Sequence, residues 1–130
     1  MNRPRVKPFA LLLSAAITLV PLPVRSDEAS ADDLKAAASW CATAARVGRG
    51  WLEESLPDRY VRRALKTGAD ELDRLDRSIA KRGDAGHLAV AESATAVRRV
   101  GEAVERNDIA SLPGRLTDLQ RRSRALAAAR

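Results

Sequence analysis

A run of positions in the middle of the chain repeats in alternating steps of four and three residues, and this spacing restricts the fold more than any other feature. The positions are Val61, Leu65, Gly68, Leu72, Leu75 and Ile79. Steps of four and three keep side chains on one face of an α-helix, whereas steps of two are typical of a strand. The pattern predicts a helix over residues 56–82 with one face buried against other helices.

Three further segments show the same spacing, and we expect helices over residues 31–54, 85–106 and 109–128. Their repeating positions are Leu34, Ala37, Cys41, Ala44 and Val47, then Val90, Ala94, Val97, Gly101 and Val104, then Ile109, Leu112, Leu116, Leu119, Ser123 and Leu126. Aromatic residues, which favour strands, make up only 3% of the chain. The sequence therefore predicts an all-α fold.

Two segments carry the signals of a helix start. Ser30 with Asp33, and Ser55 with Asp58, have the spacing of a capping box. Pro57 would lie in the first turn of the second helix, where its missing N–H costs nothing. We expect Ser30 and Ser55 to cap the first and second helices.

Glycine and asparagine mark the expected helix ends. Gly83 follows two basic residues and predicts the end of the second helix, after which Asp84 can cap the third. The third helix is expected to stop near Asn107 and Asp108. Interior glycines destabilise a helix by about 1 kcal/mol each, so residues 48–50 predict a bend or an end in the first helix.

Short connections make consecutive helices antiparallel neighbours, which predicts an up-down-up-down four-helix bundle. The first helix then lies beside the last. Residues 27–58 hold seven acids and three bases, whereas residues 98–130 hold eight bases and four acids. We expect these two oppositely charged segments to face each other.

The first 26 residues have the build of a secretory signal peptide. Three basic residues precede an apolar block that runs from Phe9 to Val20, and small residues precede a cut expected after Ser26. The block is shorter than the roughly 20 residues that a membrane-spanning helix needs. We therefore expect a periplasmic or secreted protein that leaves by the general secretion route, with residues 27–130 as one bundle domain.

The leader contains four basic residues and no acid. Without it, the chain has 19 bases against 17 acids, and its net charge is +2 instead of +6. This balance and the expected export argue against nucleic acid as a partner. Cys41 is the only cysteine, which rules out an internal disulfide. We expect it to pack as a small hydrophobe, with an intermolecular disulfide or a redox thiol as the alternatives. We expect stability to come from packing alone.

A layer halfway along the bundle is the first candidate site. The antiparallel register places Gly68 opposite Gly101, with Trp40, Cys41 and Leu116 at the same level. In the simpler interpretation the indole fills the space that two missing side chains leave. In the alternative, the layer is a small apolar cavity that carries a hydrophobic ligand.

Two aromatic residues flank the turn between the first and second helices and form a second candidate. Trp51 and Tyr60 could meet there as a lid on the core. If they are exposed, they are the best candidates for contact with a partner protein, because aromatic residues on a charged surface are typical of interfaces.

The last helix holds a third candidate, an anion-binding or membrane-surface site. Arginine doublets occur at residues 62–63, 98–99 and 121–122. In the last helix the basic residues are Arg115, Arg121, Arg122 and Arg124. They either balance the acids of the first helix or contact anionic lipid or an envelope polymer.

The sequence predicts no catalytic, metal or cofactor site. His87 is the only histidine and lacks neighbours at ligand spacing. The carboxylates fall mostly in acid-first pairs four residues apart, which suit an exposed helix face. We therefore expect a non-enzymatic binding or accessory protein whose partner is another envelope protein, with ligand carriage in the core or anion binding by the last helix as alternatives.

Overall fold

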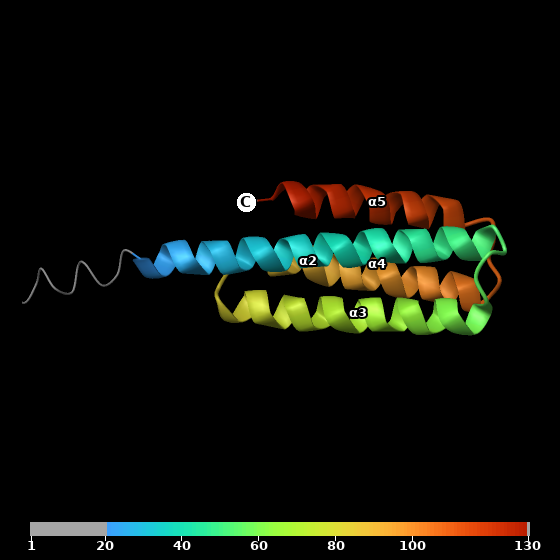
Figure 1. The fold of residues 1–130 in the computed structure, drawn as a ribbon, viewed down its shortest axis with the longest axis horizontal. Helices are drawn as coiled ribbons and strands as arrows, with labels where there is room; N and C mark the ends of the chain where they lie inside the picture. Colours follow the sequence, from blue (N-terminus) through green and yellow to red (C-terminus); the bar gives the residue numbers. More distant parts are fainter. Residues whose placement is uncertain (1–20, 130) are drawn as a thin grey trace, which may run out of the picture.

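The computed structural model describes residues 21–129, and this part of the chain contains four α-helices and no strand (Figure 1). The helices are α2 (Pro21–Leu52), α3 (Asp58–Lys81), α4 (His87–Glu105) and α5 (Leu112–Ala128). Consecutive helices run in opposite directions along a common axis (Figure 1). The predicted all-α fold is confirmed.

Helix α2 lies between α3 and α5 and also approaches α4 across the bundle. Helix α4 completes the bundle by packing against α3 and α5, which do not approach each other within the described residues. All six repeating positions of α3 are buried. The buried face of α3 is therefore the one that the four-and-three spacing predicts.

The predicted leader covers residues 1–26, of which 1–20 lie outside the described residues and 21–26 belong to α2. Helix α2 extends past the end of α3 at the left of Figure 1. In the described part of the chain, no helix combines the length and the apolar character that crossing a bilayer requires.

The predicted N-cap at Ser30 is wrong, because α2 begins at Pro21 and passes through Ser30 without interruption. Residues 24–29 contain no glycine or proline to stop it. Pro21 and Pro23 lie in the first turn, where proline is tolerated. Ser30 is instead buried, and its Oγ accepts a hydrogen bond from Arg82 Nε at 3.3 Å.

The predicted bend at residues 48–50 is also wrong, because α2 continues through them to Leu52. Both glycines are buried. A Cβ placed on Gly48 would lie 2.5 Å from Cδ2 of Leu116, and one placed on Gly50 would lie 2.6 Å from Cδ1 of Leu56. The glycines therefore serve close packing against α5 and against the following turn.

Ser55 does not cap α3 as predicted. Its backbone N–H and its Oγ both donate to the carbonyl of Gly50, at 2.9 and 3.1 Å. Helix α3 begins only at Asp58, without a side-chain cap. Ser55 therefore satisfies a free carbonyl at the end of α2, because it lies too far ahead of α3 to reach that helix's N–H groups.

The predicted ends of α3 and α4 are confirmed. Gly83 has φ of +75° and Asn107 has φ of +56°, and each is followed by a residue whose N–H reaches back five positions to a helix carbonyl. This is the Schellman motif, which favours glycine or asparagine at the left-handed position. Asp84 does not cap α4 as predicted, because its Oδ1 accepts a hydrogen bond from the N–H of Gly86, which precedes the helix, and no side chain caps the first turn.

Helix α5 begins at Leu112, later than residue 109 but next to Ser111, where the position of Pro113 predicts that regular helix starts. Ile109 was expected among its buried positions but is 55% exposed in the turn before α5. Asp108 accepts hydrogen bonds from the backbone N–H and the Oγ of Ser111, and α5 begins at Leu112 with Pro113 in its first turn. Ile109 is thus left outside the helix.

Helices α2 and α5 pack along each other as predicted, but within residues 30–129 no ion pair joins them. Asp33 of α2 pairs with Arg82 at the end of α3. The contact between α2 and α5 includes a hydrogen bond in which Ser123 Oγ donates to the carbonyl of Ala38 at 2.8 Å.

Candidate functional site

The end of the bundle that holds the α2–α3 and α4–α5 turns carries a hollow of about 290 Å³. Apolar side chains from both turns line it, namely Trp51, Leu52, Leu56 and Ile109. Its polar walls come from Glu54, Asp58 and Asn107. We call this hollow the turn-end pocket.

Trp51 is held in place at this pocket. Its indole Nε1 donates a hydrogen bond of 2.7 Å to Oδ1 of Asp58, the first residue of α3. Trp51 is half-buried against the core, so its ring has both an inner and an outer contact face. A fixed, amphipathic ring is the kind of group that interfaces use.

Exposed large apolar residues also gather at this end. Tyr60 is 53% exposed in the first turn of α3, and Ile109 belongs to the turn-end pocket. A third such residue, Leu88, lies in the first turn of α4 at the opposite end. The sequence predicts either a core lid or an exposed contact for Trp51 and Tyr60, and it assigns Ile109 to the core. In the structure Tyr60 and Ile109 are both exposed, and Trp51 and Ile109 line the turn-end pocket, whereas Tyr60 does not.

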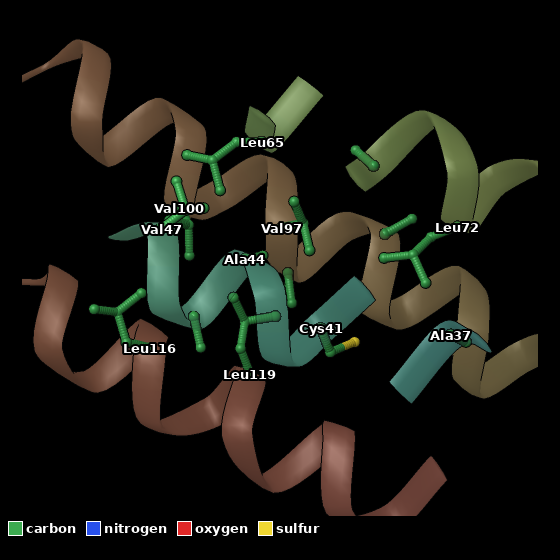
Figure 2. Close-up of a cluster of buried hydrophobic side chains, with 14 of the residues drawn as sticks. Ala37, Cys41, Ala44, Val47, Leu65, Leu72, Val97, Val100, Leu116 and Leu119 are labelled. Atoms are coloured by element: carbon green, nitrogen blue, oxygen red, sulfur yellow. The ribbon is translucent and has the colours of Figure 1, made fainter. Parts of the chain in front are cut away.

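The residues predicted to form one mid-bundle layer do not share a single space in the structure. A Cβ on Gly68 would meet Trp40 at 3.7 Å and Val97 at 3.9 Å, whereas a Cβ on Gly101 would meet nothing within 4 Å. Leu116 packs against Gly48. Figure 2 shows Cys41 and Leu116 among core side chains from all four helices. The indole therefore fills the space at Gly68, and Gly101 faces a separate space at the surface.

Cys41 is fully buried in this core. Burial raises the pKa of its thiol, and a hydrogen bond with Ser93 opposes this effect without cancelling it. Because the thiolate is the reactive form, a raised pKa together with burial makes this cysteine a packing residue.

The arginines of α5 are largely engaged within the chain. Arg121 and Arg122 both bond to Asp118, and Arg122 also reaches Glu92 at 3.4 Å. The hydrogen bond that Arg122 Nε donates to Oδ2 of Asp118 raises the pKa of the Arg122 guanidinium. Arg115 and Arg122 line a hollow of about 470 Å³ between α4 and α5, and Arg124 is exposed.

A further groove of about 650 Å³ runs between α3 and α4. Its floor consists of Leu65, Ala69, Val97 and Gly101. Charged side chains form its walls, among them Arg62 and Arg63. Sequence reasoning identified that arginine doublet and Gly101 separately. It did not join them, because whether two helices leave space between them depends on side-chain volumes that spacing does not encode.

His87 lies at the start of α4, with Nδ1 3.0 Å from Oδ1 of Asp76 on α3. Across residues 30–129, no group of three or more His, Cys, Asp or Glu side chains is arranged to hold a metal ion. The contact between His87 and Asp76 therefore belongs to the packing of α3 against α4.

Comparison of the chain with family models, with curated proteins and with solved structures gives no match.

Proposed function

We propose that this chain is an exported, non-enzymatic binding protein that attaches to another envelope protein through the turn-end pocket. The observation that carries the proposal is the meeting of two turns in one apolar hollow, with Trp51 fixed on one side and Ile109 exposed on the other. Exposed apolar side chains around a hollow are typical of contact sites.

The chemistry of the pocket defines the partner. Its charged walls are both acidic, from Glu54 and Asp58. A complementary segment would place one apolar side chain against Trp51 and Ile109, with a lysine or arginine beside it. The apolar contact would supply most of the affinity, and the cation would set orientation and speed association.

Export is the second part of the proposal, and its support is the basic and apolar order of the first 26 residues. Mass spectrometry of the protein recovered from the periplasm or medium should give a chain that begins at Asp27. Recovery of the full-length chain from the cytosol alone would refute export.

Site-specific crosslinking tests the contact surface. A photoreactive phenylalanine at Tyr60 or at Ile109 should crosslink to one partner in intact cells, whereas the same residue at Leu88 should not. Leu88 is a matched control because it is 60% exposed and apolar but lies at the other end of the bundle.

The crosslinked partner must then bind the purified chain. Tyr60→Ser combined with Ile109→Ser should weaken this binding at least about tenfold, because both residues are exposed and contribute apolar contact. Leu88→Ser should leave binding unchanged, and all variants should keep the same far-UV circular dichroism. Equal crosslinking from all three positions would refute the turn-end pocket as the contact site.

A further inference from the structure

The groove between α3 and α4 is a second possible binding site, separate from the turn-end pocket. It extends along α3 from Arg59 to Asp70, which is about 16 Å of helix. Its volume of about 650 Å³ falls within the range of small-molecule sites, about 300–1,000 Å³.

The floor of the groove is apolar and its space is open. Leu65, Ala69 and Val97 form this floor with Gly101. A Cβ on Gly101 would meet no atom within 4 Å, so the missing side chain leaves room above the floor. An unbranched hydrocarbon chain has the shape and polarity to lie there.

The α3 wall of the groove supplies cations that have no partner in the described structure. Lys66 pairs with Asp70, and Arg98 pairs with Asp73. Within residues 30–129, Arg59, Arg62 and Arg63 form no ion pair. Guanidinium groups that form no ion pair with a carboxylate are suited to bind a phosphate.

The α4 wall presents the opposite charge. Glu102 and Glu105 line it, and over the same residue range neither forms an ion pair, even with the arginines across the groove. Asp70 on the α3 wall and Arg98 on the α4 wall are engaged in ion pairs, so the charges without a partner are cationic on α3 and anionic on α4, on either side of one apolar floor. A ligand that matches the groove carries a phosphate and an ammonium on one headgroup, together with a single hydrocarbon tail.

We propose that this groove binds a single-chain zwitterionic phospholipid. The tail lies on the floor between Leu65 and Gly101, the phosphate contacts Arg62 and Arg63, and the ammonium faces Glu102 and Glu105. This inference does not depend on the proposed function, because it uses a different surface and a different class of ligand.

Calorimetric titration of the purified exported chain with myristoyl lysophosphatidylethanolamine, below its micelle-forming concentration, tests the proposal. We expect saturable binding of one lipid per chain. Gly101→Leu should weaken binding at least tenfold by filling the groove. Gly114→Leu is the matched control, because a Cβ on that α5 glycine also meets nothing within 4 Å, and it should bind normally.

Surface variants test the headgroup without altering the floor. Arg62→Gln with Arg63→Gln should weaken binding at least tenfold, whereas Arg77→Gln with Arg124→Gln, outside the groove, should not. Glu102→Gln with Glu105→Gln should weaken binding of the ethanolamine lipid but not of myristoyl lysophosphatidylglycerol, which lacks the ammonium.

Three outcomes would overturn the proposal. The first is absence of saturable binding by the wild-type chain. The second is binding that Gly101→Leu and the Arg62 and Arg63 variant leave intact. The third is a dimer in sedimentation that lipid does not dissociate and Gly101→Leu abolishes, since a second copy would then occupy the groove. Loss of the turn-end partner in the crosslinking experiment would leave these results unaffected.

Discussion

Gly48 of α2 lies directly against Leu116 of α5, so closely that a Cβ on the glycine would be 2.5 Å from Cδ2 of the leucine. Leu116 is only 2% exposed and is enclosed by the core shown in Figure 2. The contact ties the first and last helices together near the turn end of the bundle. A glycine that would weaken an isolated helix is therefore required by the packing of this one.

Gly48→Ala should destabilise the protein although alanine is the better helix former. The gain in helix propensity is about 1 kcal/mol, and overpacking of a close-packed core costs about 1–3 kcal/mol. We expect a net loss of roughly 1 kcal/mol in the free energy of unfolding, measured by urea denaturation followed by circular dichroism.

Gly114→Ala is the control, since its Cβ meets nothing and α5 should gain about 0.5 kcal/mol. The double variant Gly48→Ala with Leu116→Ala should lose less stability than the two single changes together, because the shorter side chain makes room. A stabilising Gly48→Ala would contradict the assigned contact.

The helices themselves were predictable because burial and periodicity are linked. All six repeating positions of α3 are buried, and the turns at Gly83 and Asn107 follow from residues that tolerate a left-handed backbone. These features are local. Each can be read from a few neighbouring residues without knowledge of the partner helix.

The contacts between helices could not be read in this way. Gly48 has the same sequence signature whether it bends a helix or admits a neighbour, and only the position of Leu116 decides. The sequence predicts that Gly101 faces Gly68. In the structure Gly101 lines a surface groove, whereas Gly68 lies against Trp40. Heptad arithmetic gives the level of a residue along the bundle. It does not give the direction of its side chain closely enough to assign a cavity.

Arg82 joins the end of α3 to the middle of α2, and its removal should loosen both. Its guanidinium contacts the carboxylate of Asp33 and donates to Ser78 Oγ at 3.2 Å, besides its bond to Ser30. Arg82→Met should cost about 1 kcal/mol, because partly buried ion pairs with several hydrogen bonds exceed exposed ones. Amide hydrogen exchange should accelerate around Ser30.

Lys66→Met is the matched control for Arg82→Met. The side chains of Lys66 and Asp70 are 78% and 56% exposed, and such a pair on one helix contributes only about 0.3–0.5 kcal/mol. Equal losses in the two variants would mean that the contacts of Arg82 do not join the helices.

Cys41 should react with a thiol reagent only when the bundle opens. Its side chain has no exposed surface, and burial raises the pKa of the thiol. We expect labelling by a disulfide reagent to be negligible in buffer and to rise with urea in step with the loss of helicity. Fast labelling of a fully helical chain would contradict the placement of Cys41 in the core.

Two aspartates in the turns should make the fold sensitive to acid. The backbone N–H of Gly86 lowers the pKa of Asp84, and the hydroxyl and N–H of Ser111 lower the pKa of Asp108. The unfolded chain has the ordinary aspartate pKa of about 3.9. Because the folded-state values lie below this, the carboxylates stabilise the fold above about pH 4, and this stabilisation is lost as the pH falls through the lower values.

Thermal melting between pH 7 and pH 2 measures this effect. The wild-type melting temperature should fall below about pH 4, because protonation removes the negative charge that strengthens the hydrogen bonds of these two aspartates in the turns before α4 and α5. Asp84→Asn with Asp108→Asn should lower the melting temperature at pH 7 and give a flatter profile in acid, since an amide does not titrate there. Asp32→Asn, on the exposed side of α2, should keep the wild-type profile. Parallel curves for the wild type and the double variant would show that other groups control acid unfolding.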